Sequence, residues 1–148
     1  MMEMKCNDIV FGEMIYKHRW YKNGSVSLFG CDWDIVIAVQ ALSGGPINKS
    51  QQECYLRYQK EALVIRQKVE QCIINYINNN IDWLALSWMN ARKIVSPYDL
   101  ADVVSPSTLL FKQDGTTLIL FNCAWDKEHG IAIKLYPEFE IGLQDMFL

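Results

Sequence analysis

The residues best suited to chemistry stand together in one segment near the end of the chain, Trp125-Asp126-Lys127-Glu128-His129-Gly130. Histidine is a general acid or base near neutral pH, and it works best when a carboxylate orients its ring. Glu128 adjoins His129, but adjacent side chains on a strand point to opposite faces, so this glutamate is badly placed for that role. Asp34, at the equivalent place in an earlier copy of the segment, would serve if the two copies meet.

The same segment also satisfies the requirements of a tight turn. Asp126 is expected to accept a hydrogen bond from the backbone N–H two residues on, and Gly130 to supply the positive φ that closes a hairpin loop of about three to five residues. Trp125 would then cap the end of the core. Two interpretations stay open: a structural turn, or a loop tip that presents Glu128 and His129 for binding.

Zinc binding is a weaker interpretation of these residues. Cys123, His129 and Cys31 would supply a Cys-Cys-His set of ligand types that zinc accepts. No pair of them has the close spacing of a zinc motif. The five cysteines of the chain are an odd number without any C-x-x-C, so they do not indicate a disulfide framework either. We therefore predict buried, reduced cysteines, with no metal and no cofactor.

The segment belongs to the second copy of a block that the chain uses twice. Phe29-Gly30-Cys31-Asp32-Trp33-Asp34 and Phe121-Asn122-Cys123-Ala124-Trp125-Asp126 share the pattern Phe-x-Cys-x-Trp-Asp. Each copy follows a turn signal, Asn23-Gly24 or Asp114-Gly115, and precedes an apolar run. Each therefore predicts a turn, a strand, a Trp-Asp corner and a second strand.

Between the two copies the sequence predicts helices. From Ser50 to Ile77 apolar residues recur at steps of three and four, which is the stripe of an amphipathic helix, and Asn48 or Ser50 is placed to cap it. A second helix is expected over residues 81–94. A short helix is expected over residues 97–104, opened by a serine cap followed by proline.

These elements predict an α+β fold in a single domain over residues 1–148. An antiparallel sheet from two β-hairpin units, one N-terminal and one C-terminal, would pack on the long central amphipathic helix. The pattern does not decide whether the two units join in one sheet or form two.

The composition excludes several classes of protein. The net charge is −3 and the pI about 5.3, so no basic field favours nucleic acid. The N-terminus lacks the apolar region of a signal peptide, and no apolar stretch approaches the roughly 20 residues of a membrane span. We expect a cytoplasmic protein that binds neither nucleic acid nor membrane.

The segment from Phe121 to Ile131 resembles the W-D-x-E-H-G signature of a group of small uncharacterised bacterial domains. In that group the signature also follows a strand near the C-terminus, and an upstream amphipathic helix begins with glutamines, as at Gln51-Gln52 here. Some of those proteins are encoded beside secreted or contact-delivered toxins. The resemblance implies a bacterial, cytoplasmic α+β domain with an immunity or binding role.

No catalytic constellation stands out in the sequence, so a non-enzymatic protein-binding role is favoured, with a toxin domain as the candidate partner. Acidic residues outnumber basic ones from Asp126 onward, which suits a basic partner. The predicted binding residues are Trp125, Asp126, Glu128, His129, Trp33, Asp34, Glu138 and Glu140. The alternative is a small enzyme or ligand-binding domain that uses the Trp-Asp-Lys-Glu-His-Gly loop. The oligomeric state stays open.

Overall fold

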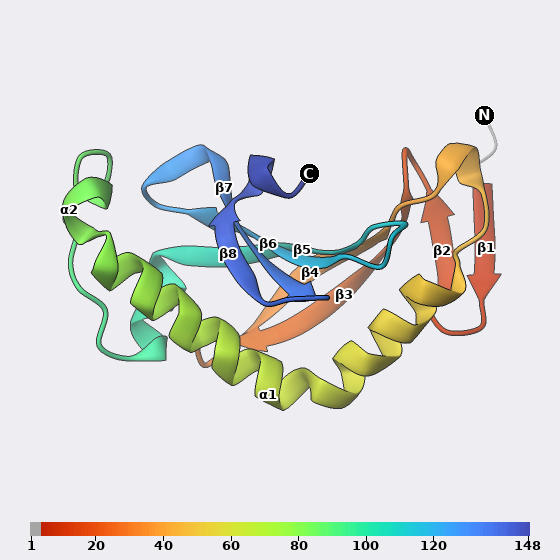
Figure 1. Cartoon of the computed structure of the whole chain (residues 1–148), viewed down its shortest axis with the longest axis horizontal. Helices are drawn as coiled ribbons and strands as arrows, with labels where there is room; N and C mark the ends of the chain where they lie inside the picture. The colour runs from red at the N-terminus through yellow and green to blue at the C-terminus, as the bar shows by residue number, and fades with distance from the viewer. Residues whose placement is uncertain (1–3) are drawn as a thin grey trace.

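A computed structural model describes residues 4–148 as one eight-stranded sheet with one long helix (Figure 1). The strands are β1 (Met4–Asp8), β2 (Gly12–Tyr16), β3 (Trp20–Leu28), β4 (Cys31–Val39), β5 (Val104–Phe111), β6 (Thr117–Cys123), β7 (Asp126–Tyr136) and β8 (Glu140–Leu143). The helices are α1 (Lys49–Asn79) and α2 (Ile81–Leu84), with the 3-10 turns η1 (Leu42–Gly44), η2 (Pro97–Asp102) and η3 (Gln144–Met146). The predicted α+β class is confirmed.

The strands lie in the sheet in the same order as in the sequence, and every neighbouring pair is antiparallel except one. β4 and β5 are parallel, in register from Val36 opposite Thr108 to Val39 opposite Phe111. The prediction of a wholly antiparallel sheet is therefore wrong at this pair. Its cause is the long connection that contains α1, because only a connection of that length lets the chain return to the same end of the sheet. The two β units thus form one sheet.

The first predicted turn is also in the wrong place. Asn23 and Gly24 lie inside β3, where Gly24 stands opposite Ile35. The chain turns instead at Phe29 and Gly30, whose φ angles of 58° and 76° are both positive, as a two-residue hairpin loop of type I′ requires. A phenylalanine is rare in that conformation, so turn propensity alone points to the Asn-Gly pair. The turn predicted at Asp114-Gly115 is confirmed between β5 and β6.

The long helix is confirmed and begins as expected. The side chain of Asn48 accepts a hydrogen bond from the backbone N–H of Gln51, whose own side chain accepts one from the backbone N–H of Asn48. The buried residues of α1 are Gln51, Tyr55, Ile65, Val69, Ile73, Ile74 and Ile77, so the stripe seen in the sequence is buried only in part, and Ala62 within it is exposed. The apolar members of this set belong to the larger hydrophobic core, together with side chains of β3 to β7.

The region after α1 differs from the prediction of a helix over residues 81–94. Helical structure ends at Leu84, and turns follow as far as Asn90, which has a φ of 64°. Leu84 and Trp88 are buried, so the apolar spacing that suggested a helix reflects anchoring to the core. The short helix opened by Ser96 is confirmed as η2, but the chain enters β5 at Val104, so Ser105-Pro106 lies within a strand.

Gln51 joins the start of α1 to the sheet and is completely buried. Its Nε2 donates to the backbone oxygens of Gln40, at 2.8 Å, and Phe111, at 3.2 Å. We expect Gln51→Met to lower the free energy of unfolding by about 2 kcal/mol, because it leaves the partly buried oxygen of Gln40 without this donor and removes half of the helix cap, whereas the oxygen of Phe111 still accepts from the backbone N–H of Gln40. Urea denaturation measures this. Gln67→Met, on the exposed side of the same helix, is the matched control and should change stability by no more than about 0.5 kcal/mol.

Candidate functional site

The second Trp-Asp corner is built as a hairpin with a wide bulge. Cys123 pairs with Asp126, so the turn consists of Ala124 and Trp125 alone. The next pair is Phe121 with Ile131, which leaves residues 127–130 of β7 opposite one residue of β6. The expected loop closed by Gly130 is therefore wrong in its boundaries. The predicted functional segment forms an exposed bulge on a paired strand.

Gly130 makes this bulge possible. Its φ is 69°, and a Cβ at this position would lie 2.3 Å from the backbone oxygen of Phe121 and 2.6 Å from Nε2 of Gln144. Gln144 in η3 donates from that same Nε2 to the oxygens of Phe121, at 3.0 Å, and Ile131, at 3.4 Å. The C-terminal turn thus clamps the base of the bulge. Sequence reasoning missed Gln144, since a lone glutamine far from the motif carries no recognisable pattern.

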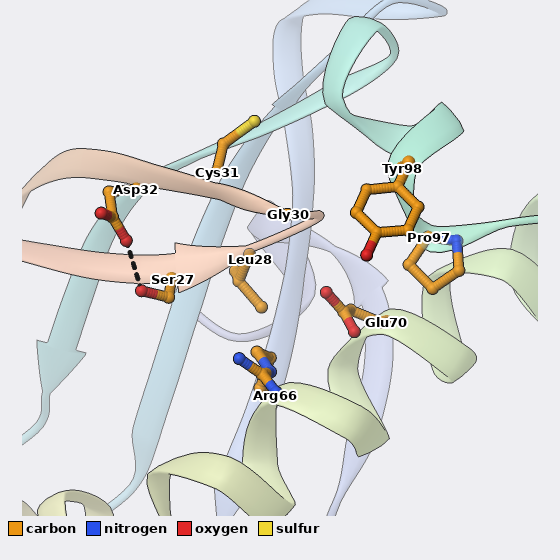
Figure 2. Close-up of a pocket in the computed structure, with 9 residues that line it drawn as sticks. All are labelled: Ser27, Leu28, Gly30, Cys31, Asp32, Arg66, Glu70, Pro97 and Tyr98. Carbon is orange, nitrogen blue, oxygen red and sulfur yellow. Dashed lines mark hydrogen bonds between the residues drawn. The ribbon is translucent and has the colours of Figure 1, made fainter.

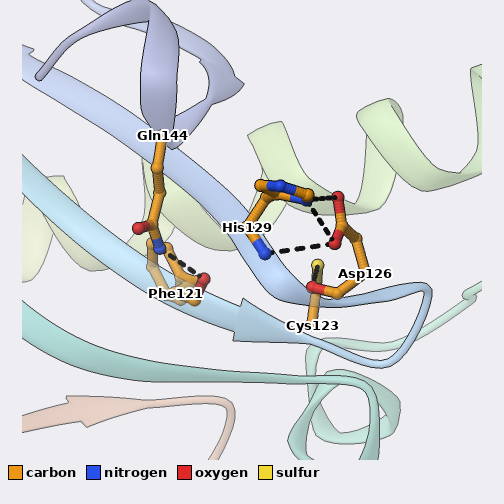
Figure 3. Close-up of polar contacts among 5 residues, drawn as sticks. All are labelled: Phe121, Cys123, Asp126, His129 and Gln144. Atoms are coloured by element: carbon orange, nitrogen blue, oxygen red, sulfur yellow. Dashed lines mark hydrogen bonds and ion pairs between the residues drawn. The ribbon is translucent and has the colours of Figure 1, made fainter.

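Asp126 is the carboxylate that orients His129 (Figure 3). Its Oδ1 accepts a hydrogen bond from the backbone N–H of His129 at 3.1 Å and lies 3.0 Å from Nδ1 of the ring. The backbone donor is three residues on, where two were expected. The partner predicted for His129, Asp34, makes no hydrogen bond to it among the described residues. The bulge therefore builds its carboxylate–histidine pair locally.

The ion pair with Asp126 shifts both titrations. The hydrogen bond and negative charge of Asp126 raise the pKa of His129, and the charges of Asp145 and Glu128 add to this increase. Desolvation opposes ionisation of Asp126, but the N–H groups and ring of His129 outweigh it and lower the pKa of that carboxyl. Asp145 comes from η3, so the charges of three acids act on one exposed histidine.

This geometry predicts the titration of His129. Its pKa in the wild-type protein should lie above the ordinary value of about 6.5, and Asp126→Asn should bring it back down, because the variant removes both the charge and the strong acceptor. The pair stabilises the fold fully below the ordinary pKa of histidine and loses that effect as pH rises through the higher folded-state value. NMR titration of the ring protons measures the shift. Asp34→Asn is the control, and a shift of His129 in that variant would contradict the assignment.

The zinc interpretation finds no support in this arrangement. Burial raises the pKa of the Cys123 thiol to about 11, so the group is a neutral thiol at physiological pH. Its Sγ lies 3.5 Å from the backbone oxygen of Asp126, within hydrogen-bonding reach. Cys31 is exposed, on a different hairpin. Within residues 4–148 no group of three potential ligands is arranged around a metal position.

The first Trp-Asp corner has a structural role of its own. Trp33 is half-buried, donates from Nε1 to the oxygen of Leu28 at 2.9 Å, and lies edge-on to Phe29. The two copies meet through their phenylalanines, since the ring centroids of Phe29 and Phe121 are 6.4 Å apart. No aromatic contact joins the two tryptophans within the described chain, and Asp34 is exposed on β4. The two copies of the repeat thus contact each other through their phenylalanines in the core, and their Trp-Asp pairs do not form one combined site.

Trp125 anchors the segment that follows α1. Its ring centroid lies 5.7 Å from that of Trp88 and 6.2 Å from that of Tyr76. Further along, the side chain of Asn78 bonds both the N–H and the oxygen of Ile94, at 2.7 and 2.8 Å. The segment between α1 and η2 is therefore held to the core at several points.

Between Ile81 and Asn90, three large apolar side chains of this anchored segment face outward. Trp83 is 73% exposed, Leu86 79% and Met89 86%. Side chains of this size are costly to leave in water, and tryptophan and methionine are enriched at protein interfaces. Sequence reasoning missed all three, because it assigned this stretch to a helix with a buried face.

The acidic residues that follow Trp125 in the sequence lie in two separate groups. The charges of Asp126, Glu128 and Asp145 all raise the pKa of His129. Glu138 and Glu140 follow the opposite end of β7, and Glu140 forms an ion pair with Lys134 at 3.2 Å. Only the first group adjoins the Trp125 corner.

The sequence profile of a domain of unknown function, DUF6985, matches residues 10–148. The chain belongs to this family. No curated protein and no solved structure gives a significant match. Among the described residues of this DUF6985 domain, no helix is long and apolar enough to cross a membrane.

Proposed function

We propose that this DUF6985 domain acts without catalysis, by binding another protein through the surface formed by Trp83, Leu86, Met89 and the acids Asp126, Glu128 and Asp145, here called the corner surface. The observation that carries the proposal is the exposure of three large apolar side chains on a segment fixed to the core through Trp88 and Trp125. A fixed display of this kind loses little conformational entropy on binding.

The composition of the corner surface resembles that of a protein interface. Trp83 and Met89 lie on the segment that Trp88 anchors against Trp125, and the acidic Asp126 directly follows Trp125. An apolar centre beside a charged rim is typical of a protein interface. The rim is negative, which favours a partner with a basic surface and speeds its association. With the signature around His129, this supports a bacterial, cytoplasmic immunity protein that occludes a basic toxin domain.

Co-expression with the product of the adjacent gene tests this proposal. We expect the two proteins to co-purify through a tag on the partner and to co-elute in size-exclusion chromatography. The double variant Trp83→Ser, Met89→Ser should elute alone while keeping its melting temperature. Val64→Ser, an exposed apolar position on α1, is the matched control and should still co-elute. Co-elution of the double variant at wild-type affinity would contradict the proposal.

The contribution of the negative rim is tested separately, by measuring the rate at which the partner associates. Glu128→Gln with Asp145→Asn should slow association with that partner about tenfold at low salt and flatten its salt dependence. Glu138→Gln with Glu140→Gln removes the same charge at the far end of β7 and should leave the rate nearly unchanged. Equal effects of both pairs would show that only net charge matters.

A second candidate function is favoured by one observation, the carboxylate-oriented ring of His129. A small enzyme or ligand-binding domain would use this pair as an acid or base. His129→Ala would then abolish an activity or ligand affinity with little change in melting temperature. Against this candidate, four pockets on the described chain are lined by other residues than Asp126, Glu128 and His129.

A further inference from the structure

One edge of the sheet is open in the middle of the molecule. β2 pairs with β3 only at Tyr21 and Trp20, so the rest of β3 has a neighbour on one side alone. In the β3–β4 hairpin, closed by Leu28 opposite Cys31, every second residue of β3 bonds to β4. The intervening residues, Asn23, Ser25 and Ser27, direct their N–H and C=O groups outward, and no hydrogen bond to these groups exists among the described residues.

This edge lacks the features that normally protect an open strand. Proteins protect such edges with proline, lysine or a bulge. From Asn23 to Leu28 the strand has none of these, and its register with β4 is continuous. The backbone N–H and C=O groups of Asn23, Ser25 and Ser27 have no partner in the described part of the chain and occur at every second residue. This is the spacing at which an added strand forms its hydrogen bonds.

A cleft of about 410 Å³ lies beside this edge, between β3 and α1. Its lining is mainly apolar and includes Val26, Ile35, Ala62 and Leu63. The side chain of Ile37 fills the space beside Gly24, since its Cδ1 would lie 2.5 Å from a Cβ at that position, so the opening along β3 lies beside Val26. A strand added to β3 would direct every second side chain into the cleft.

A charged group lies where the cleft meets a second pocket of about 380 Å³ at the end of β3 (Figure 2). Arg66 lines both and forms no ion pair with a described residue, although its spacing to Glu70 predicts one. Glu70 instead accepts a hydrogen bond from the backbone N–H of Phe29 at 2.7 Å. The guanidinium of Arg66 therefore remains available for a carboxylate of a bound chain.

We propose that the groove between β3 and α1 binds an extended peptide segment of a partner protein, which adds a strand to β3, inserts apolar side chains beside Val26 and Ala62, and places an acidic side chain against Arg66. The inference does not rest on the function proposed above, because it uses other residues and its variants leave the corner surface intact.

A displayed library of random twelve-residue peptides, selected on the purified full chain, tests the inference. Enriched peptides should alternate apolar and polar residues and contain an acidic residue, and calorimetry then measures their affinities. Ser25→Pro removes an outward N–H without breaking the β3–β4 ladder and should weaken binding at least tenfold. Ser25→Thr keeps the N–H and should bind as the wild type does.

Two further comparisons make the result specific. Ala62→Phe fills the cleft and should abolish binding, whereas Val64→Phe, away from the groove on the same helix, should not. Only every second amide of an added strand faces β3. N-methylation of these amides should therefore block binding, and N-methylation of the intervening amides should not. Failure to enrich any peptide, or affinities that Ser25→Pro and Ala62→Phe leave unchanged, would overturn the proposal. So would a dimer in light scattering that Ser25→Pro dissociates, since the occupant would then be a second copy of this chain.

Discussion

Gly130→Ala is expected to lower the free energy of unfolding by about 3 kcal/mol or more, a large share of the stability of a domain of this size. Two effects add at this position. A non-glycine residue is strained at a φ of 69°, and its Cβ would overlap the backbone oxygen of Phe121, 2.3 Å away. Relief requires the bulge to move off β6 and breaks the clamp of Gln144. Urea or thermal denaturation measures the loss.

Gly12→Ala is the matched control for this prediction. Gly12 also has a positive φ, 80°, but a Cβ there would meet no atom within 4 Å. Gly12→Ala therefore introduces backbone strain alone and should lower the free energy of unfolding by about 1 to 2 kcal/mol. Equal losses in the two variants would show that the contact between the bulge and β6 contributes nothing, and that the observed shape of the bulge is not required for stability.

Trp83→Ala is expected to weaken binding of the co-purified partner by about 2 kcal/mol, or about thirtyfold in Kd, with almost no change in stability. The side chain is 73% exposed in the free protein, so its loss removes little from the fold. A tryptophan at the centre of an interface commonly contributes this much. Calorimetry on the purified complex measures Kd, and Leu56→Ala, exposed on α1, is the control. An unchanged Kd for Trp83→Ala would contradict the claim that Trp83 lies at the centre of the interface.

The parts of the fold that depend on local pattern were predictable. The cap at Asn48, the long helix that it begins and the turn at Gly115 each follow from neighbouring residues, and each is confirmed. The hairpin at Phe29-Gly30 was not predictable, because Phe29 has a φ that is rare for a residue other than glycine, and its buried ring packs beside Phe121, which is distant in the sequence. The parallel pairing of β4 with β5 is likewise set by contacts between distant residues.

The candidate site divides in the same way. The motif indicated that Asp126, His129 and Gly130 are important. In the structure Asp126 and His129 are joined by hydrogen bonds, and Gly130 has the positive φ that the bulge requires. Which carboxylate orients the histidine depends on how β7 is bulged, and the spacing alone does not fix that geometry. The contribution of Gln144 and the exposure of Trp83 depend on tertiary packing, so no local pattern indicates them.

Hydrogen exchange of the co-purified complex tests the central claim most directly, because it locates the bound surface without mutation. We predict slower exchange on binding at the amides of residues 81–95 and 126–129, with residues 23–28 unchanged. Protection restricted to residues 23–28 would contradict the corner surface and would place the partner on the open edge of β3. Protection at neither region would also contradict the corner surface.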